Sequence, residues 1–154
     1  MKNYIYQEGI FNCQWLSKFI NCWFFKGEKF KIETLIYNSF VLLKKKLVTN
    51  GLFLLFETLE RLKPWIGLKL RRNIKQRKSQ IQAHPVILTN NVQYRKAIYW
   101  LVKSIEFRKE NNFSIRMSKE IKSVIFCEMT NSLNKKKEYY NYAIMFKSVR
   151  KFKW

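Results

Sequence analysis

The sequence predicts a mainly α-helical bundle of about six helices, interrupted once by a basic β-hairpin arm. Two observations lead to this fold class. Apolar residues recur at helical spacing through most of the 154-residue chain, whereas residues 65–88 lose that period and place two apolar segments around a basic run. A chain of this length suits one domain. We therefore expect a single domain over 1–154, with the arm at about 65–88 and a basic, aromatic C-terminal tail at about 147–154.

Three helices are expected before the arm, at about 12–26, at about 28–47, and between the Asn50-Gly51 break and Pro64. Gly27 separates the first two, and the second ends in three lysines, where positive charge suits a helix C-terminus. Their apolar residues recur at i, i+3 and i+4 and should face the core: Trp15, Leu16, Phe19, Ile20, Trp23, Phe24, Leu35, Ile36, Phe40, Leu43, Leu52, Leu55, Phe56, Leu59 and Leu62. A bundle of this size needs that surface buried, which favours a core position for the aromatic face of 12–26 over a membrane-binding one.

Residues 65–88 predict a hairpin instead of a helix. The segments "WIGLKL" and "HPVIL" have the composition of strands, and Pro85 pushes His84 toward an extended backbone. Between them, half of the residues of 69–80 are basic and none is acidic: Lys69, Arg71, Arg72, Lys75, Arg77 and Lys78. So much like charge on one projecting element favours contact with a polyanion over a purely solvated loop.

Three further helices are expected after the arm, at about 90–110, 116–134 and 137–149. Thr89 or Asn90 should cap the first of them, and "KENNFS" should form the loop that follows it. The side chains expected to face the core are Ile98, Leu101, Val102, Ile105, Met117, Ile121, Val124, Ile125, Met129, Tyr140, Ala143 and Ile144. The last residues, "VRKFKW", alternate cations that suit phosphates with rings that suit bases.

The composition argues against an enzyme and against a metal or cofactor site. The chain has no aspartate, a single histidine at His84 and four scattered glycines, so it contains neither a Ser-His-Asp triad nor a glycine-rich phosphate loop. Four glutamates lie near lysine or arginine and favour a solvated face: Glu57, Glu60, Glu106 and Glu110. The three cysteines fit no common zinc spacing and should be small buried side chains: Cys13, Cys22 and Cys127. We therefore expect no enzymatic activity, no cofactor and no metal.

The charge balance indicates the kind of partner. Lysine and arginine number 31 against 10 acidic residues, which gives a net charge of +21 and a pI near 10.1. Such a chain repels itself when compact, so a polyanion is expected to offset the charge. Nucleic acid is the first candidate and an anionic membrane surface the second. The abundance of Lys, Asn, Ile, Phe and Tyr follows AT-rich codons and is typical of a small AT-rich genome, such as that of an organelle.

A series of short motifs occurs in a characteristic order. These are "KFIN" at 18–21 with Gly27 after it, Pro64 before "IGLKL" and Arg71-Arg72, "AIYWLV" at 97–102, Met117, "KKE" at 136–138, and Phe152-Lys153-Trp154 at the end. In this order they resemble the universal ribosomal protein seven family of the small subunit, in its bacterial and organellar form, over nearly the whole chain. That family carries "AIRWLV" in its fourth helix and ends in aromatic-Arg-Trp. The chain departs from it where "RRNIKQRKSQIQAHP" lacks both glycines of the family's "RRVGG", and where "AIMFKSVRKFKW" shortens the usual ending.

The resemblance implies a non-enzymatic structural role. Members of the family bind the three-prime major domain of small-subunit ribosomal RNA, help to assemble the head, and line the exit-site tRNA and mRNA exit region, which the arm reaches. The expected partners are therefore small-subunit ribosomal RNA and neighbouring subunit proteins, with exit-site tRNA and mRNA as further ones and no membrane. The expected RNA-binding residues are Lys18, Lys29, Lys69, Arg71, Arg72, Lys75, Arg77, Lys78, Arg95, Arg108, Arg116, Lys135, Lys136, Lys137, Lys151, Lys153 and Trp154.

The drift from the family pattern, together with the codon bias, favours a mitochondrial location, in the small subunit of the matrix ribosome. A plastid or another organelle is the alternative location. The alternative function is that of a basic amphipathic membrane-surface protein or a general RNA-binding protein.

Overall fold

Six helices and one antiparallel hairpin build the described part of the chain. The computed structural model describes residues 13–23, 27–72 and 81–148, with side chains described except at 70–72, 81–84 and 146–148. In chain order the elements are α1 (Gln14–Cys22), α2 (Lys29–Leu47), α3 (Gly51–Leu62), β1 (Ile66–Arg72), β2 (Ile81–Ile87), α4 (Asn90–Phe107), α5 (Phe113–Ile125) and α6 (Asn131–Ser148). The predicted fold class is confirmed.

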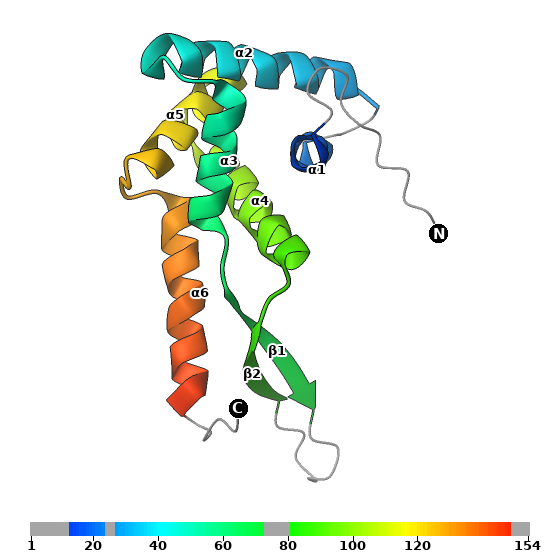
Figure 1. Ribbon diagram of the computed structural model, residues 1–154, viewed down its shortest axis with the longest axis vertical. Helices are drawn as coiled ribbons and strands as arrows, with labels where there is room; N and C mark the ends of the chain where they lie inside the picture. Colours follow the sequence, from blue (N-terminus) through cyan, green and yellow to red (C-terminus); the bar gives the residue numbers. More distant parts are fainter. Residues whose placement is uncertain (1–12, 24–26, 73–80, 149–154) are drawn as a thin grey trace.

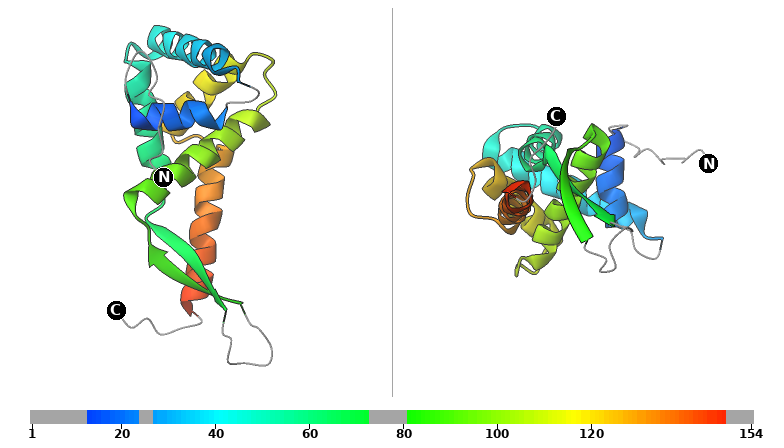
Figure 2. Two further views of the ribbon diagram at one scale, coloured as in Figure 1. Left: turned by 90° about the vertical axis from the view of Figure 1, so that its right-hand side faces the viewer. Right: turned by 90° about the horizontal axis from the view of Figure 1, so that it is seen from below.

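The helices divide into a packed bundle and a projecting part. α2 lies across one end of the bundle, over α3 and α5, while α6 and the hairpin extend together from the opposite end (Figure 1). A view turned by 90° also shows α6 and the hairpin side by side (Figure 2). The long axis of the molecule therefore comes from α6 and the arm, and the bundle is their support.

Residues of the first five helices, α1, α2, α3, α4 and α5, form one hydrophobic core, and most of the predicted core residues belong to it. Phe19, Leu101 and Met117 have no exposed surface. Truncating the fully buried Phe19 ring to alanine should cost about 3–5 kcal/mol of stability. Six predicted core residues are only half-buried: Trp15, Trp23, Leu52 and Ile125, which pack against the core, and Phe56 and Tyr140. Phe24 lies outside the described residues.

Three side chains predicted to face the core are exposed instead. Leu35 is 38% exposed because the buried stripe of α2 runs through Ile36, one residue further along the helix. Met129 is 84% exposed because α5 ends at Ile125 and leaves Met129 in the following loop. Ile144 is 64% exposed because this part of α6 projects beyond the bundle.

The ends of α5 and α6 differ from the prediction of helices at 116–134 and 137–149. α5 begins at Phe113, because the Asn112 side chain accepts a hydrogen bond from the Ser114 N–H at 3.1 Å and caps the helix. "KENNFS" is therefore partly helical. α5 ends where Cys127 takes a left-handed backbone with φ of 55°, and α6 starts at Asn131. Neither glycine nor proline marks this boundary in the sequence.

The cysteine prediction was wrong for two of the three residues. Cys22 and Cys127 are exposed, and Cys13 is half-buried. Cys22 ends α1 and Cys127 lies in the turn after α5, so both occupy positions that the core does not cover. None of the described cysteines forms a disulfide, and the described residues contain no group of three or more metal-binding side chains.

The corner between α2 and α3 is tight. Val48 ends α2 in a left-handed conformation with φ of 58°, and its N–H donates to the Lys44 carbonyl at 2.9 Å. Asn50 caps α3 by accepting from the Leu52 N–H. A Cβ on Gly51 would lie 2.5 Å from the Phe40 Cβ and 2.7 Å from its Cα. Glycine is required at this position because the two helices cross without room for a side chain.

The predicted hairpin is confirmed, with strands that pair from Ile66↔Ile87 to Arg72↔Ile81. Its tip, residues 73–80, lies outside the described residues. Two tyrosines of α6 fix the hairpin to the helix: the Trp65 N–H donates to the Tyr140 hydroxyl at 3.0 Å, and the Leu68 N–H donates to the Tyr139 hydroxyl at 3.1 Å. α6 therefore sets the direction in which the arm leaves the bundle.

Candidate nucleic-acid interface

The predicted RNA-binding residues fall into three groups. Lys69, Arg95 and Lys137 are exposed, and six others are half-buried: Lys18, Lys29, Arg108, Arg116, Lys135 and Lys136. Arg71 and Arg72 occupy the last positions of β1, but their side chains are not among those described. The remaining predicted residues of the tip and tail lie outside the described residues: Lys75, Arg77, Lys78, Lys151, Lys153 and Trp154.

Arg108 is half-buried and paired within the protein. Its Nε lies 2.7 Å from a carboxylate oxygen of Glu120, a residue only 2% exposed, and its Nη2 donates to the Ser123 hydroxyl at 3.2 Å. Hydroxyls of Ser104 and Ser132 donate to the other Glu120 oxygen. The network joins α4, α5 and α6, so the geometry gives Arg108 a structural task in the protein.

Lys136 is also turned inward, although its neighbour Lys137 is exposed. Its ammonium donates to the Arg61 carbonyl at the end of α3 and lies 6.0 Å from the centroid of the Tyr140 ring. Burial, together with the nearby charge of Lys63, lowers the pKa of Lys136. The basic cluster predicted at 135–137 therefore presents Lys137 outward and uses Lys136 to attach α6 to α3.

Aromatic rings and lysines alternate where α1, α3, α4 and the hairpin meet. Lys18 lies 4.2 Å from the centroid of the Trp15 ring, and Trp15 stacks on Tyr94 with centroids 4.3 Å apart. Lys63 lies 5.3 Å from the Tyr94 centroid and 5.7 Å from that of Trp65. We call Lys18, Trp15, Tyr94, Lys63 and Trp65 the aromatic ladder. It offers rings and cations together, the combination that unpaired nucleotides bind.

Glu60 fixes the middle of the aromatic ladder. It pairs with Lys63 and accepts a hydrogen bond from the Tyr94 hydroxyl. That hydrogen bond, with a smaller effect of burial, raises the pKa of Tyr94 to about 12. Burial by itself raises the pKa of Glu60, but the hydrogen bonds from Lys63 and Tyr94 outweigh it and lower that pKa overall.

The glutamates interpreted as members of a solvated face do form surface ion pairs. Glu57 pairs with Arg61 four residues on, Glu60 with Lys63 and Glu106 with Lys103. Glu110 pairs with Lys119 and Arg108. Each of the four glutamates therefore has a cationic partner close to it in the fold.

Comparison with known proteins decides the family. A model of the family described as ribosomal protein S7p/S5e matches residues 1–145. The chain belongs to the ribosomal protein S7p/S5e family. It is 32% identical to the small ribosomal subunit protein uS7m of Reclinomonas americana over 117 residues, which are 76% of this chain and 71% of that protein. It is 29% identical to the uS7 protein of Wigglesworthia glossinidia brevipalpis over 143 residues, 93% of this chain and 88% of that one.

This member of the S7p/S5e family uses contacts that sequence reasoning missed. Trp65 and Tyr94 lie beside basic residues in "LKPWI" and "QYRKA", and that neighbourhood is the signal that marks them as interface candidates. Tyr139 and Tyr140 follow the basic cluster in "KKKEYYNY". Their bonds to the hairpin backbone have no equivalent signal, because a side chain on α6 meets an N–H more than 70 residues earlier.

Proposed function

We propose that this chain is a structural protein of the small ribosomal subunit, which binds ribosomal RNA and neighbouring subunit proteins and catalyses no reaction. Family membership carries the proposal, because the matched region, 1–145, includes the bundle, the hairpin and most of α6. The net charge of +21 supports it, since ribosomal RNA supplies the anionic surface that offsets self-repulsion.

A membrane-surface protein would need an exposed apolar face, and the apolar face of α1 is buried. Leu16, Phe19 and Ile20, on the face that would enter lipid, have no exposed surface and belong to the core. Lipid binding through that face would require α1 to leave the bundle. No described helix has both the length and the apolar composition to cross a bilayer.

The finer proposal concerns the place of binding. We propose contact with the three-prime major domain of the ribosomal RNA, a role in assembly of the head, and an arm tip near exit-site tRNA and mRNA. Three exposed basic residues favour an RNA contact that runs along the arm, α4 and α6: Lys69, Arg95 and Lys137. We place the chain in a mitochondrial ribosome, and the similarity to the mitochondrial uS7m protein and the AT-rich composition support that location.

Sedimentation tests the proposed function directly. An organelle lysate is separated on a sucrose gradient and each fraction is probed for this chain. The chain should sediment with small-subunit ribosomal RNA and move to the top of the gradient after ribonuclease treatment. Sedimentation with membranes, or at the top of an untreated gradient, would contradict the proposal.

The salt dependence of RNA binding tests which lysines face RNA. Each neutralised phosphate contributes about −0.7 to −0.9 to the slope of log affinity against log salt. Lys69→Ala should reduce the slope by up to about that amount if this exposed lysine contacts one phosphate. Lys136→Ala is the matched control and should leave the slope unchanged, because its ammonium is bound to the Arg61 carbonyl. A smaller slope for Lys136→Ala with an unchanged slope for Lys69→Ala would show that Lys136 contacts RNA and Lys69 does not.

The arm itself divides into a base and a tip with different proposed tasks. Two sets of alanine variants test this: Arg71 with Arg72 at the base, and Lys75, Arg77 and Lys78 at the tip. The base variant should enter small subunits poorly, because paired guanidinium groups grip phosphates bidentately. The tip variant should enter them normally and disturb translation. Poor incorporation of the tip variant alone would reverse this assignment.

A further inference from the structure

We propose that Trp65 is a stacking platform for the base of an unpaired ribosomal RNA nucleotide. The proposal rests on the proposed function and deepens it, because it names a kind of RNA contact that phosphate-binding lysines do not make. Trp65 stands at the junction of α3 and β1, where the arm begins, and 63% of its surface is exposed.

The backbone of Trp65 is held by hydrogen bonds, although its side chain is exposed to solvent. Its N–H donates to the Tyr140 hydroxyl at 3.0 Å, and its carbonyl accepts from the Leu88 N–H at 3.0 Å. Pro64, the preceding residue, is buried and has a restricted backbone. A residue of α6, the residue that follows β2 and the preceding proline therefore hold the backbone of Trp65 in place. Because the backbone is already ordered, base stacking has to fix only the side-chain torsions of Trp65, which limits the conformational entropy lost on binding.

The surroundings of the ring favour a nucleotide. The ammonium of Lys63 lies 5.7 Å from the ring centroid, and the exposed Lys69 lies four residues further along the chain, on β1. A nucleotide whose base is bound to Trp65 carries a phosphate, and the exposed Lys69 offers a cation for the RNA along the arm, while Lys63 is already paired with Glu60. The rest of the aromatic ladder continues with Tyr94, Trp15 and Lys18 onto α4 and α1. Base stacking on an aromatic ring is tolerant of sequence, so one ring can accept any unpaired base.

Binding of two RNA probes separates stacking from charge. The probes are a single-stranded oligoadenylate of ten nucleotides and an RNA duplex of equal total charge. Trp65→Leu keeps an apolar side chain but removes the aromatic face, and it should weaken binding of the oligoadenylate about 5- to 150-fold. Duplex binding should change less than about twofold, because paired bases are not available to the ring. The slope of log affinity against log salt should stay the same for both probes, since no charge is removed.

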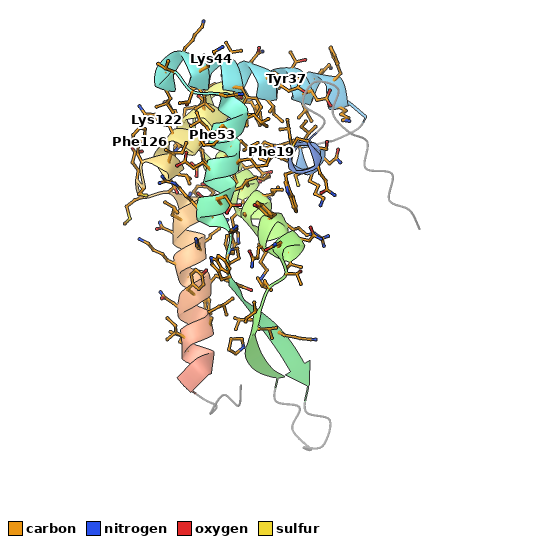
Figure 3. The ribbon with its side chains drawn as sticks, in the orientation of Figure 1. Phe19, Tyr37, Lys44, Phe53, Lys122 and Phe126 are labelled. Carbon is orange, nitrogen blue, oxygen red and sulfur yellow. The ribbon has the colours of Figure 1, made fainter. Side chains whose placement is uncertain are left out.

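Phe53 provides a matched control. It is also an exposed aromatic residue of the bundle surface, with the same exposed fraction of 63%, but it lies near the start of α3, at the opposite end from the arm (Figure 3). Phe53→Leu should leave binding of both probes unchanged. Trp65→Phe restores an aromatic face and should bind the oligoadenylate within about threefold of the parent chain.

Several results would overturn the proposal. Equal loss of oligoadenylate binding in Trp65→Leu and Phe53→Leu would assign the effect to general surface change. Equal loss of duplex binding, or failure of Trp65→Phe to restore binding, would exclude stacking. Unchanged oligoadenylate binding by Trp65→Leu, with the chain still sedimenting in small subunits, would refute the platform alone and favour a neighbouring protein as the partner of Trp65. Failure of the parent chain to sediment with small subunits would instead refute the proposed function.

Discussion

Replacing Arg108 by alanine should destabilise the protein without changing the salt dependence of its RNA binding. The guanidinium Nε lies 2.7 Å from Glu120, whose side chain is 2% exposed. Alanine at this position would leave the Glu120 charge buried without its cation. If Arg108 bound RNA, the opposite result would be expected: Arg108→Ala would reduce the salt slope of RNA binding and change stability little.

The size of the effect follows from the burial of the pair. Breaking a fully buried ion pair by removing one partner costs about 3–5 kcal/mol. The Arg108 side chain is 23% exposed, and hydroxyls of Ser104 and Ser132 continue to donate to Glu120 in the variant. We therefore expect a smaller loss than that range, about 2–3 kcal/mol. For a chain of this length the midpoint of thermal unfolding should fall by about 4–12 °C.

Denaturant unfolding measures the change, and two further variants make it specific. Arg95→Ala removes an exposed arginine of α4 and should stay within about 0.5 kcal/mol of the parent chain. Adding Glu120→Gln to the Arg108→Ala chain removes the unpaired charge and should recover about 1 kcal/mol or more. If Arg108→Ala is as stable as Arg95→Ala but binds RNA with a smaller salt slope, the network is not what holds Arg108 and the residue belongs to the RNA interface.

Three further outcomes are expected. Gly51→Ala should lower the free energy of unfolding by about 1–3 kcal/mol, because its methyl group would lie 2.7 Å from the Phe40 Cα; an unchanged denaturation midpoint would show that the α2–α3 corner can open. Val48→Gly should raise it by about 1 kcal/mol, because glycine adopts φ of 58° freely and the valine is 89% exposed; a decrease would mean that the valine side chain stabilises the corner. The pKa of Tyr94, raised from 10.0 to about 12, means that its hydrogen bond to Glu60 contributes stability below pH 10 that is lost as the pH rises through 12. Chemical denaturation across this window should therefore show a smaller loss for Tyr94→Phe than for the parent chain, and an equal loss would exclude the hydrogen bond as the cause.

The helical bundle could be predicted because its period is local. Phe19, Ile36 and Leu101 are buried where helical spacing placed them. The boundary between α5 and α6 could not be predicted in the same way, since apolar spacing continues past Ile125 while the backbone turns at Cys127. A positive φ at a residue other than glycine depends on tertiary packing and leaves little trace in the sequence.

The candidate interface was harder to predict than the fold. Arg95 and Arg108 look equivalent in a basic sequence, but one is exposed and the other pairs with a buried carboxylate. The difference arises because Glu120 lies on the same buried face of α5 as Met117 and Val124, so it needs a cation from another helix. The sequence signal for such a network is an acid within an apolar stripe. Charge counting alone cannot separate a structural arginine from an RNA-binding one.

The attachment of the arm to α6 also bears on the order in which the chain is made. Tyr140 and Tyr139 follow their partners Trp65 and Leu68 by 75 and 71 residues. At a synthesis rate of about 5–20 residues per second, the hairpin leaves the ribosome that makes it about 4–15 s before these tyrosines do. During that interval the outer N–H groups of β1 have no α6 beside them, and an uncovered strand edge invites pairing with other chains. The basic residues of β1, Lys69 among them, oppose such pairing by repulsion while the newly made arm waits for its helix.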